Sequence, residues 1–155
     1  MLNIRSATID DVPELRQLIW ELAEYESKAE LVRTTEADIS RDGFGPHPEF
    51  RALIAEWRGE TAGFALFFNH YSTWTGAGLY LEDLFVRSDF RRKGIGQALI
   101  SAVARVATQE NRTFLRWLVL EWNQPAISMY GKLGADFLDE WRTVSIADDN
   151  LKKLT

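Results

Sequence analysis

The chain has 155 residues, no cysteine, 46% hydrophobic residues and a net charge of −5, which predicts a single domain over residues 1–155 and excludes disulfides and cysteine-based catalysis. The acidic excess argues against a nucleic-acid surface and favours a small cationic partner. No apolar run approaches the about 18 residues that span a membrane, and neither histidine has neighbours at metal-ligand spacing, so we expect a metal-free, cytoplasmic protein.

The N-terminal third predicts a strand and two helices. Residues 3–6 read as a short strand, and Thr8 with Asp11 forms a capping-box pattern that begins a helix. The apolar residues of this helix recur with the 3.6-residue period of one helix face: Val12, Leu15, Leu18, Ile19, Leu22 and Ala23. A second, short helix is expected over residues 35–41, ending at Asp42-Gly43.

The middle of the chain predicts most of a sheet. Residues 51–57 and 61–70 read as two strands joined by the turn formers Arg58-Gly59-Glu60. Residues 78–86 form the next strand, and an amphipathic helix begins at Ile95. Residues 113–120 are almost entirely apolar, which predicts a central strand that is covered on both faces.

The C-terminal part predicts one more helix and two closing strands. Asn123 can cap this helix, with Pro125 in its first turn and Gly134 just beyond its end. Residues 135–146 are expected to form the strands, and residues 148–153 a solvated tail or short helix. The order of elements indicates an α+β fold around one mixed sheet.

The sequence Arg91-Arg92-Lys93-Gly94-Ile95-Gly96 lies between a strand and the start of a helix. Free backbone N–H groups and the positive end of the helix dipole favour an anion at this position, and the three basic side chains add full charges. The expected ligand is a phosphate or pyrophosphate.

Two common phosphate-binding loops do not fit this sequence. A P-loop places its lysine after the second glycine, whereas Lys93 precedes the first. A dinucleotide loop needs a third glycine or alanine where Leu99 stands, and the acidic residue expected about 20 positions later is missing.

The spacing Arg91-x-x-Gly94-x-Gly96 is instead similar to the acetyl-CoA loop of the GNAT superfamily of N-acetyltransferases. Four further blocks in the same order resemble its diamine and thialysine acetyltransferase branch: Tyr25-Glu26, Asp42-Gly43-Phe44-Gly45, Tyr80 to Val86, and Glu121 to Tyr130. The resemblance covers residues 3 to 141. It implies a mixed, mostly antiparallel sheet flanked by about four helices, with two central parallel strands that splay apart.

The resemblance also assigns residues to the cofactor acetyl-CoA. Backbone groups at the end of one strand would meet pantetheine, the glycine loop would hold the pyrophosphate, and the next helix would line the other side. The implied cofactor-binding residues are Leu84, Phe85, Val86, Arg91, Arg92, Lys93, Gly94, Ile95, Gly96, Gln97, Asn123, Ala126 and Tyr130.

Acetyl transfer to an alkyl amine requires removal of a proton. An amine of pKa ~10.4 is neutral in only about one molecule in a few thousand at pH 7. Glu82 interrupts an apolar strand and matches a substrate-facing carboxylate of the family, so we expect it to act through bound water or to hold the cation. Tyr130 matches the family's acid at the departing CoA sulfur. No acyl-enzyme is needed, so we expect direct attack by the amine in a ternary complex.

The acceptor is expected to be a polyamine, a diamine or a lysine-like amino acid such as thialysine. Its second ammonium needs further acidic or aromatic partners, for which the candidates are Tyr25, Glu26, Asp139 and Glu140. The resemblance also implies a homodimer. Two alternative functions remain: acetylation of peptide or protein amines, and a non-catalytic module that binds acetyl-CoA.

Overall fold

The computed structural model describes all residues from Met1 to Thr155. The chain forms two compact units, residues 1–118 and residues 119–155, and each is described by itself. No helix in either unit is long and apolar enough to cross a membrane.

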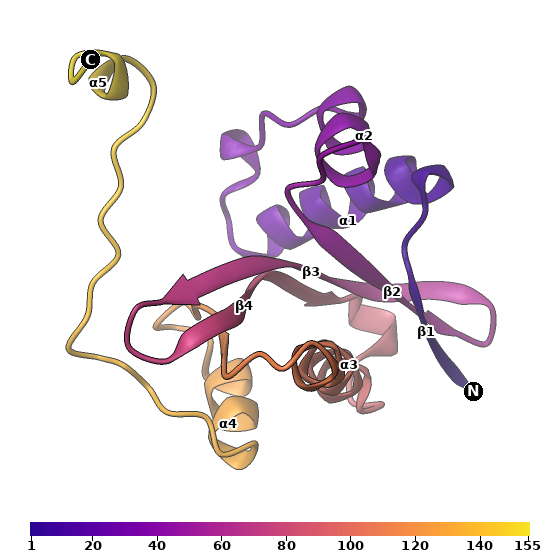
Figure 1. Ribbon diagram of the computed structural model, residues 1–155. Coiled ribbons are helices and arrows are strands. Elements are labelled where there is room, and N and C mark those ends of the chain that lie inside the picture. Colours follow the sequence, from indigo (N-terminus) through magenta and orange to yellow (C-terminus); the bar gives the residue numbers. More distant parts are fainter. The chain divides into compact units, whose positions relative to one another are not determined.

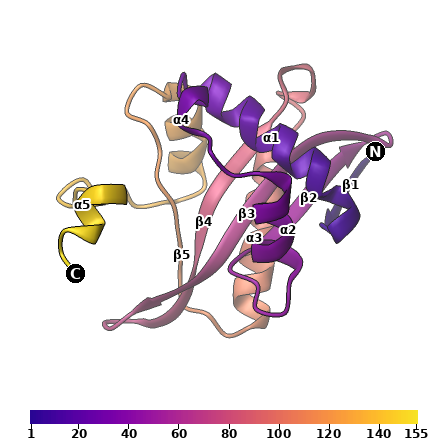
Figure 2. The same ribbon diagram turned by 90° about the horizontal axis from the view of Figure 1, so that it is seen from above.

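The first unit contains a five-stranded sheet with the order β1-β2-β3-β4-β5 (Figure 2). The strands are β1 (Leu2–Ser6), β2 (Arg51–Trp57), β3 (Glu60–Ser72), β4 (Gly76–Val86) and β5 (Leu115–Arg116). Neighbouring strands are antiparallel except β4 and β5, which are parallel. The predicted mixed, mostly antiparallel sheet is therefore confirmed.

Helices cover both faces of this sheet. The helices α1 (Val12–Tyr25) and α2 (Glu36–Phe44) lie on one face, and α3 (Ile95–Gln109) lies on the other (Figure 1). Three short 3-10 helices connect these elements: η1 (Ile9–Asp11), η2 (Ala29–Leu31) and η3 (Ser88–Phe90).

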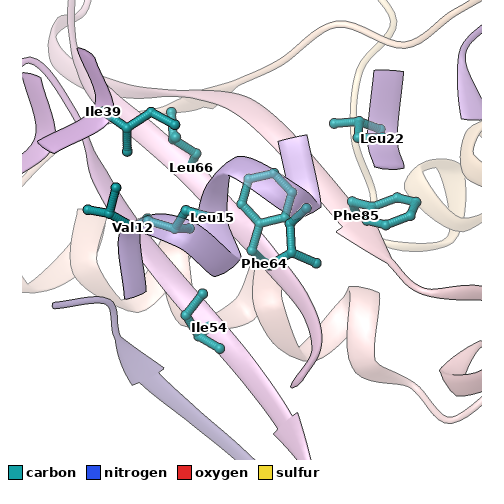
Figure 3. Packing of buried hydrophobic residues seen from close by; sticks show 10 residues of the cluster. Val12, Leu15, Leu22, Ile39, Ile54, Phe64, Leu66 and Phe85 are labelled. Carbon is teal, nitrogen blue, oxygen red and sulfur yellow. The ribbon is translucent and has the colours of Figure 1, made fainter. Parts of the chain in front are cut away.

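The core on the α1 side joins the first two helices to strands β2, β3 and β4. Leu15 and Leu18 of α1 are fully buried, as are Ile54 and Phe64 of the sheet. Figure 3 shows Leu15 beside Phe64, with Ile39 of α2 near Leu66. Burial of this apolar stripe is the main force that holds α1 against β4, the strand that leads to the glycine loop.

The predicted capping box at Thr8 is confirmed, because Asp11 accepts hydrogen bonds from the Thr8 N–H at 2.7 Å and from its hydroxyl at 3.3 Å. The predicted second helix also forms, capped by the Thr35 hydroxyl, which accepts from the Asp38 N–H, but it runs to Phe44 rather than ending at Asp42-Gly43. Arg58 and Gly59 both have positive φ angles, as a two-residue turn between twisted strands requires.

Two predictions about strands are wrong. Within residues 113–120 only Leu115–Arg116 is a strand, and it lies at an edge of the sheet rather than at its centre. Residues 135–146 contain no strand, although Val144 and Ile146 alternate with polar residues. Alternation alone cannot form a strand, because a strand needs a neighbouring edge to accept its hydrogen bonds, and neither segment has one along its length.

The second unit contains two helices, α4 (Gln124–Lys132) and α5 (Asp148–Lys152). Asn123 caps α4 by accepting a hydrogen bond from the Ala126 N–H at 3.4 Å, Pro125 lies in the first turn, and Gly134 follows the end with a φ of 82°. The prediction for this helix is confirmed, and the acidic tail forms the short helix α5.

Candidate functional site

The glycine loop lies directly before α3. Gly94 is the N-cap of this helix with a φ of 75°, in the left-handed region that favours glycine. The backbone N–H groups of Ile95, Gly96 and Gln97 donate to no acceptor in the protein, and the first such bond of the helix runs from Ala98 to the Gly94 carbonyl at 3.0 Å. These free donors at the N-terminus of a 15-residue helix fit a phosphate group.

The three basic side chains of the loop have different surroundings. The Arg91 Nε donates to the Val86 carbonyl oxygen at 3.0 Å, and its guanidinium carbon lies 4.7 Å from the centre of the Tyr25 ring. Lys93 lies over the Trp57 ring at 5.8 Å. Arg92 is exposed and forms neither an ion pair nor a side-chain hydrogen bond. Arg92 and Lys93 therefore remain accessible to a phosphate, whereas Arg91 is engaged within the protein.

Strand β4 leads into this loop with one edge partly free. Leu84, Phe85 and Val86 pair with β3 on one side. On the other side, the pairing with β5 is limited to Leu79 with Leu115 and Tyr80 with Arg116. From Leu81 onward β4 has no strand partner on the β5 side, because β5 ends at Arg116.

Glu82 lies at an irregularity of the sheet. Leu66 of β3 is opposite Asp83 and Phe67 is opposite Leu81, so Glu82 is an extra residue in a β-bulge. Bulges bend a strand and redirect a side chain, and they are common beside functional sites. The Glu82 side chain is exposed, as a group that meets a ligand must be.

Glu26, Glu82 and Asp83 form an acidic group in which no carboxylate is in an ion pair. None of the three takes part in a salt bridge or side-chain hydrogen bond, and α1 ends beside them, with the Tyr25 ring 6.5 Å from the Phe85 ring. Burial raises the pKa of Asp83 to about 7, and the charges of Glu82 and Glu26 add to this effect. Burial also raises the pKa of Glu26, against the opposing charge of Lys28.

Asp83 was missed by the sequence analysis. Its position directly after Glu82 was the only available signal, because its burial and its place beside the bulge depend on the pairing of β3 with β4.

The remaining candidates belong to the second unit. Asn123 is the N-cap of α4, and Tyr130 lies within that helix and is buried. Asp139 and Glu140 are exposed in a turn closed by the Trp141 N–H and the Leu138 carbonyl at 3.1 Å. The first unit thus brings together Tyr25, the acidic group and the loop, while these residues form a separate set.

Comparisons with known proteins agree with this arrangement. Residues 12–135 match the model of the acetyltransferase (GNAT) family. Thialysine N-epsilon-acetyltransferase of Sus scrofa is 37% identical over 162 aligned positions, which cover 97% of this chain and 95% of that protein. Spermidine/spermine N(1)-acetyltransferase-like protein 1 of Homo sapiens is 38% identical over 140 positions, 86% of this chain and 20% of that protein.

A solved structure of an integron cassette protein from V. cholerae has the same fold. Its TM-score is 0.81 at 26% identity, and the superposition covers 99% of this chain and 96% of that one. The predicted resemblance to the diamine and thialysine branch is confirmed by the named relatives. The chain belongs to the GNAT family and is an N-acetyltransferase.

Proposed function

We propose that this enzyme transfers an acetyl group from acetyl-CoA to the primary amine of a small cationic substrate, a polyamine, diamine or thialysine-like amino acid. One observation carries the proposal: unpaired carboxylates, a partly free strand edge and an anion-binding helix start follow one another along residues 82–97. This order suits an acceptor cation, a pantetheine arm and a pyrophosphate in turn.

The residues present fit acetyl-CoA, which when bound would supply the acetyl thioester. The free N–H groups of residues 95–97, with Arg92 and Lys93, would hold its pyrophosphate. The backbone of Leu84, Phe85 and Val86 would meet pantetheine, and Asn123 and Ala126 would contribute from α4.

The acidic group would receive the acceptor. Glu82 and Asp83 would hold the reacting amine and accept its proton directly or through water, and Glu26 would hold a second ammonium. The named relatives act on thialysine and, by name, on spermidine and spermine, which are cations of this kind. Asp139 and Glu140 remain further candidates for the acceptor site.

The reaction would proceed by direct attack in a ternary complex. In such a complex the Tyr130 hydroxyl would donate its proton to the leaving sulfur, and Glu82 and Asp83 would accept the proton that the amine loses as its nitrogen is acylated. A buried tyrosine suits this task because its hydroxyl is shielded from bulk water. We further propose that residues 1–155 act as one catalytic domain, in a cytoplasmic homodimer.

The test is thiol release from acetyl-CoA across a panel of spermidine, putrescine, thialysine and lysine, with Tyr130→Phe and the exposed control Tyr71→Phe. We expect turnover with at least one of these amines, a kcat about 100-fold lower for Tyr130→Phe, and an unchanged kcat for Tyr71→Phe. A wild-type kcat for Tyr130→Phe would refute its role as the acid.

The same assay separates the two alternative functions. Turnover with peptides but not with free amines would indicate a peptide or protein acetyltransferase. Tight acetyl-CoA binding by calorimetry without turnover on any amine or peptide would indicate a binding module. Size-exclusion chromatography with light scattering tests the homodimer, and a monomer at assay concentration would contradict it.

A further inference from the structure

Helix α1 carries a polar stripe that faces the segment between β4 and the glycine loop. Glu14, Glu21 and Tyr25 are separated by seven and four residues, so they lie on one face of the helix. Their partners are Arg87 and Arg91, which flank the 3-10 helix η3. The stripe therefore contacts both ends of the segment that precedes the anion-binding N–H groups.

Arg87 fixes the first end. Its guanidinium donates to both carboxylate oxygens of Glu21 at 2.8 and 3.0 Å, to Glu14 at 2.8 Å and to the Thr61 carbonyl at 3.0 Å. Its backbone N–H donates to the Ala62 carbonyl at 2.9 Å. The chain at Arg87 is thus tied to α1 and β3 together.

Arg91 fixes the second end through an aromatic ring. Its guanidinium carbon lies 4.7 Å from the centre of the Tyr25 ring and 6.0 Å from that of Phe85. The same side chain donates to the Val86 carbonyl oxygen, which closes the segment from Val86 to Arg91 into a loop. The Tyr25 ring lies against this closed loop, and a guanidinium at this distance is attracted to the face of a ring.

We propose that Tyr25 is a positioning residue for the cofactor loop rather than a ligand of the acceptor amine. By holding Arg91 over its ring, it keeps the loop in the conformation that directs the N–H groups of residues 95–97 at a phosphate. This inference rests on the proposed use of CoA. It reassigns Tyr25, which the sequence resemblance had placed in the acceptor site.

Calorimetry of CoA binding to the full chain tests the proposal. We expect Tyr25→Leu to weaken CoA binding about three- to tenfold, and Tyr25→Phe, which keeps the ring, to stay within about twofold of the wild type. In steady-state assays Tyr25→Leu should raise the KM for acetyl-CoA and leave that for the amine within about twofold. Thermal unfolding of each variant checks that it is folded.

Arg91→Met removes the other member of the same contact, and neither Tyr25 nor Arg91 lies in the buried core. The double variant Tyr25→Leu/Arg91→Met should bind CoA no more weakly than Arg91→Met alone, because the ring then has no guanidinium to hold. The matched control is Arg16→Met, which removes an arginine 5.6 Å from the Trp20 ring on the same helix and should leave CoA binding unchanged.

Three results would overturn the inference. Unchanged CoA affinity for Tyr25→Leu, fully additive effects in the double variant, or a raised KM for the amine alone would each show that Tyr25 does not position the loop. If the wild-type chain bound no CoA, the proposed function itself would fail, and the reassignment of Tyr25 with it.

Discussion

Glu14 and Glu21 within α1 differ from Glu26, the C-cap of the same helix, in the side chains that they face. Glu14 and Glu21 face Arg87, with contacts of 2.8 Å to each. Hydrogen bonds from this guanidinium lower the pKa of Glu21. Both carboxylates have their partner within the fold and need no ligand.

Glu26 ends the same helix without such a partner. It lies near Glu82 and Asp83 of β4, and burial raises the pKa of both Glu26 and Asp83. Three carboxylates without a cation repel one another and oppose folding. The presence of these carboxylates at a bulge beside the glycine loop is explained if they bind a cationic substrate.

The comparison teaches that the acidic residues around α1 and β4 form two sets: Glu14 and Glu21 are paired within the fold, whereas Glu26, Glu82 and Asp83 form no ion pair and are those we propose for the acceptor. The paired set stabilises the contact between α1 and the end of β4, and the unpaired set weakens the folded state. Substitutions in the unpaired set should therefore lower activity without lowering stability. Substitutions in the paired set should lower stability and leave activity nearly unchanged.

The largest expected effect comes from the unpaired set. Glu82→Gln should lower kcat/KM for the amine about 100-fold, because it removes the charge that holds the cation and accepts its proton. Its melting temperature should stay unchanged or rise slightly, because Glu82 has no partner to lose and the substitution relieves its repulsion of Asp83. The matched change Glu14→Gln should leave kcat/KM within about twofold, and thiol release at saturating acetyl-CoA measures both variants. Equal losses of kcat/KM for Glu82→Gln and Glu14→Gln would show that unpaired and paired carboxylates do not differ in function.

The next effect in size comes from the paired set. Arg87→Met leaves Glu14 and Glu21 without their cation at a partly buried site, and we expect the free energy of unfolding to fall by about 2 kcal/mol. Because Arg87, Glu14 and Glu21 are partly exposed, we expect a smaller loss of free energy of unfolding than for a fully buried ion pair. Urea unfolding measures this loss.

The exposed Arg105 has no ion pair, and Arg105→Met is the control, with an expected change within about 0.5 kcal/mol. Adding Glu14→Gln and Glu21→Gln to Arg87→Met should restore part of the stability. If the triple variant were less stable than Arg87→Met, carboxylate repulsion would not be the cause of the loss.

The fold of the first unit was predictable where the signal is local. Thr8 with Asp11 and Arg58-Gly59 fix a helix start and a turn through groups a few residues apart. The strands expected at residues 113–120 and 135–146 failed because a strand depends on a distant partner edge that its own alternation does not reveal.

The candidate site also contains features that local sequence predicts and features that depend on distant parts of the chain. The glycine loop and Glu82 could be predicted, because a helix N-terminus and a carboxylate in an apolar strand are visible in the sequence. The bulge at Glu82, the burial of Asp83 and the contact of Arg91 with Tyr25 could not, because each depends on the register of β3 with β4 or on the packing of α1.

The smallest expected effect concerns Asp83 and depends on pH. With its pKa raised to about 7, the folded protein retains a proton that the unfolded chain releases near pH 4, so the carboxyl makes the fold less stable as pH rises through this window. Asp83→Asn removes that dependence. We expect the free energy of unfolding of the variant to exceed that of the wild type by about 1–2 kcal/mol at pH 8 and by much less at pH 5. These values allow for the partial exposure of Asp83.

Urea unfolding at pH 5 and pH 8 measures the difference, with the exposed Asp89→Asn as the control, for which we expect a difference that does not change with pH. Spermidine at saturating concentration should reduce the advantage of Asp83→Asn at pH 8, because a bound ammonium favours the ionised carboxylate of the wild type. If the wild type were more stable than Asp83→Asn at pH 8 without spermidine, Asp83 would already have a cationic partner. It would then belong with the paired carboxylates.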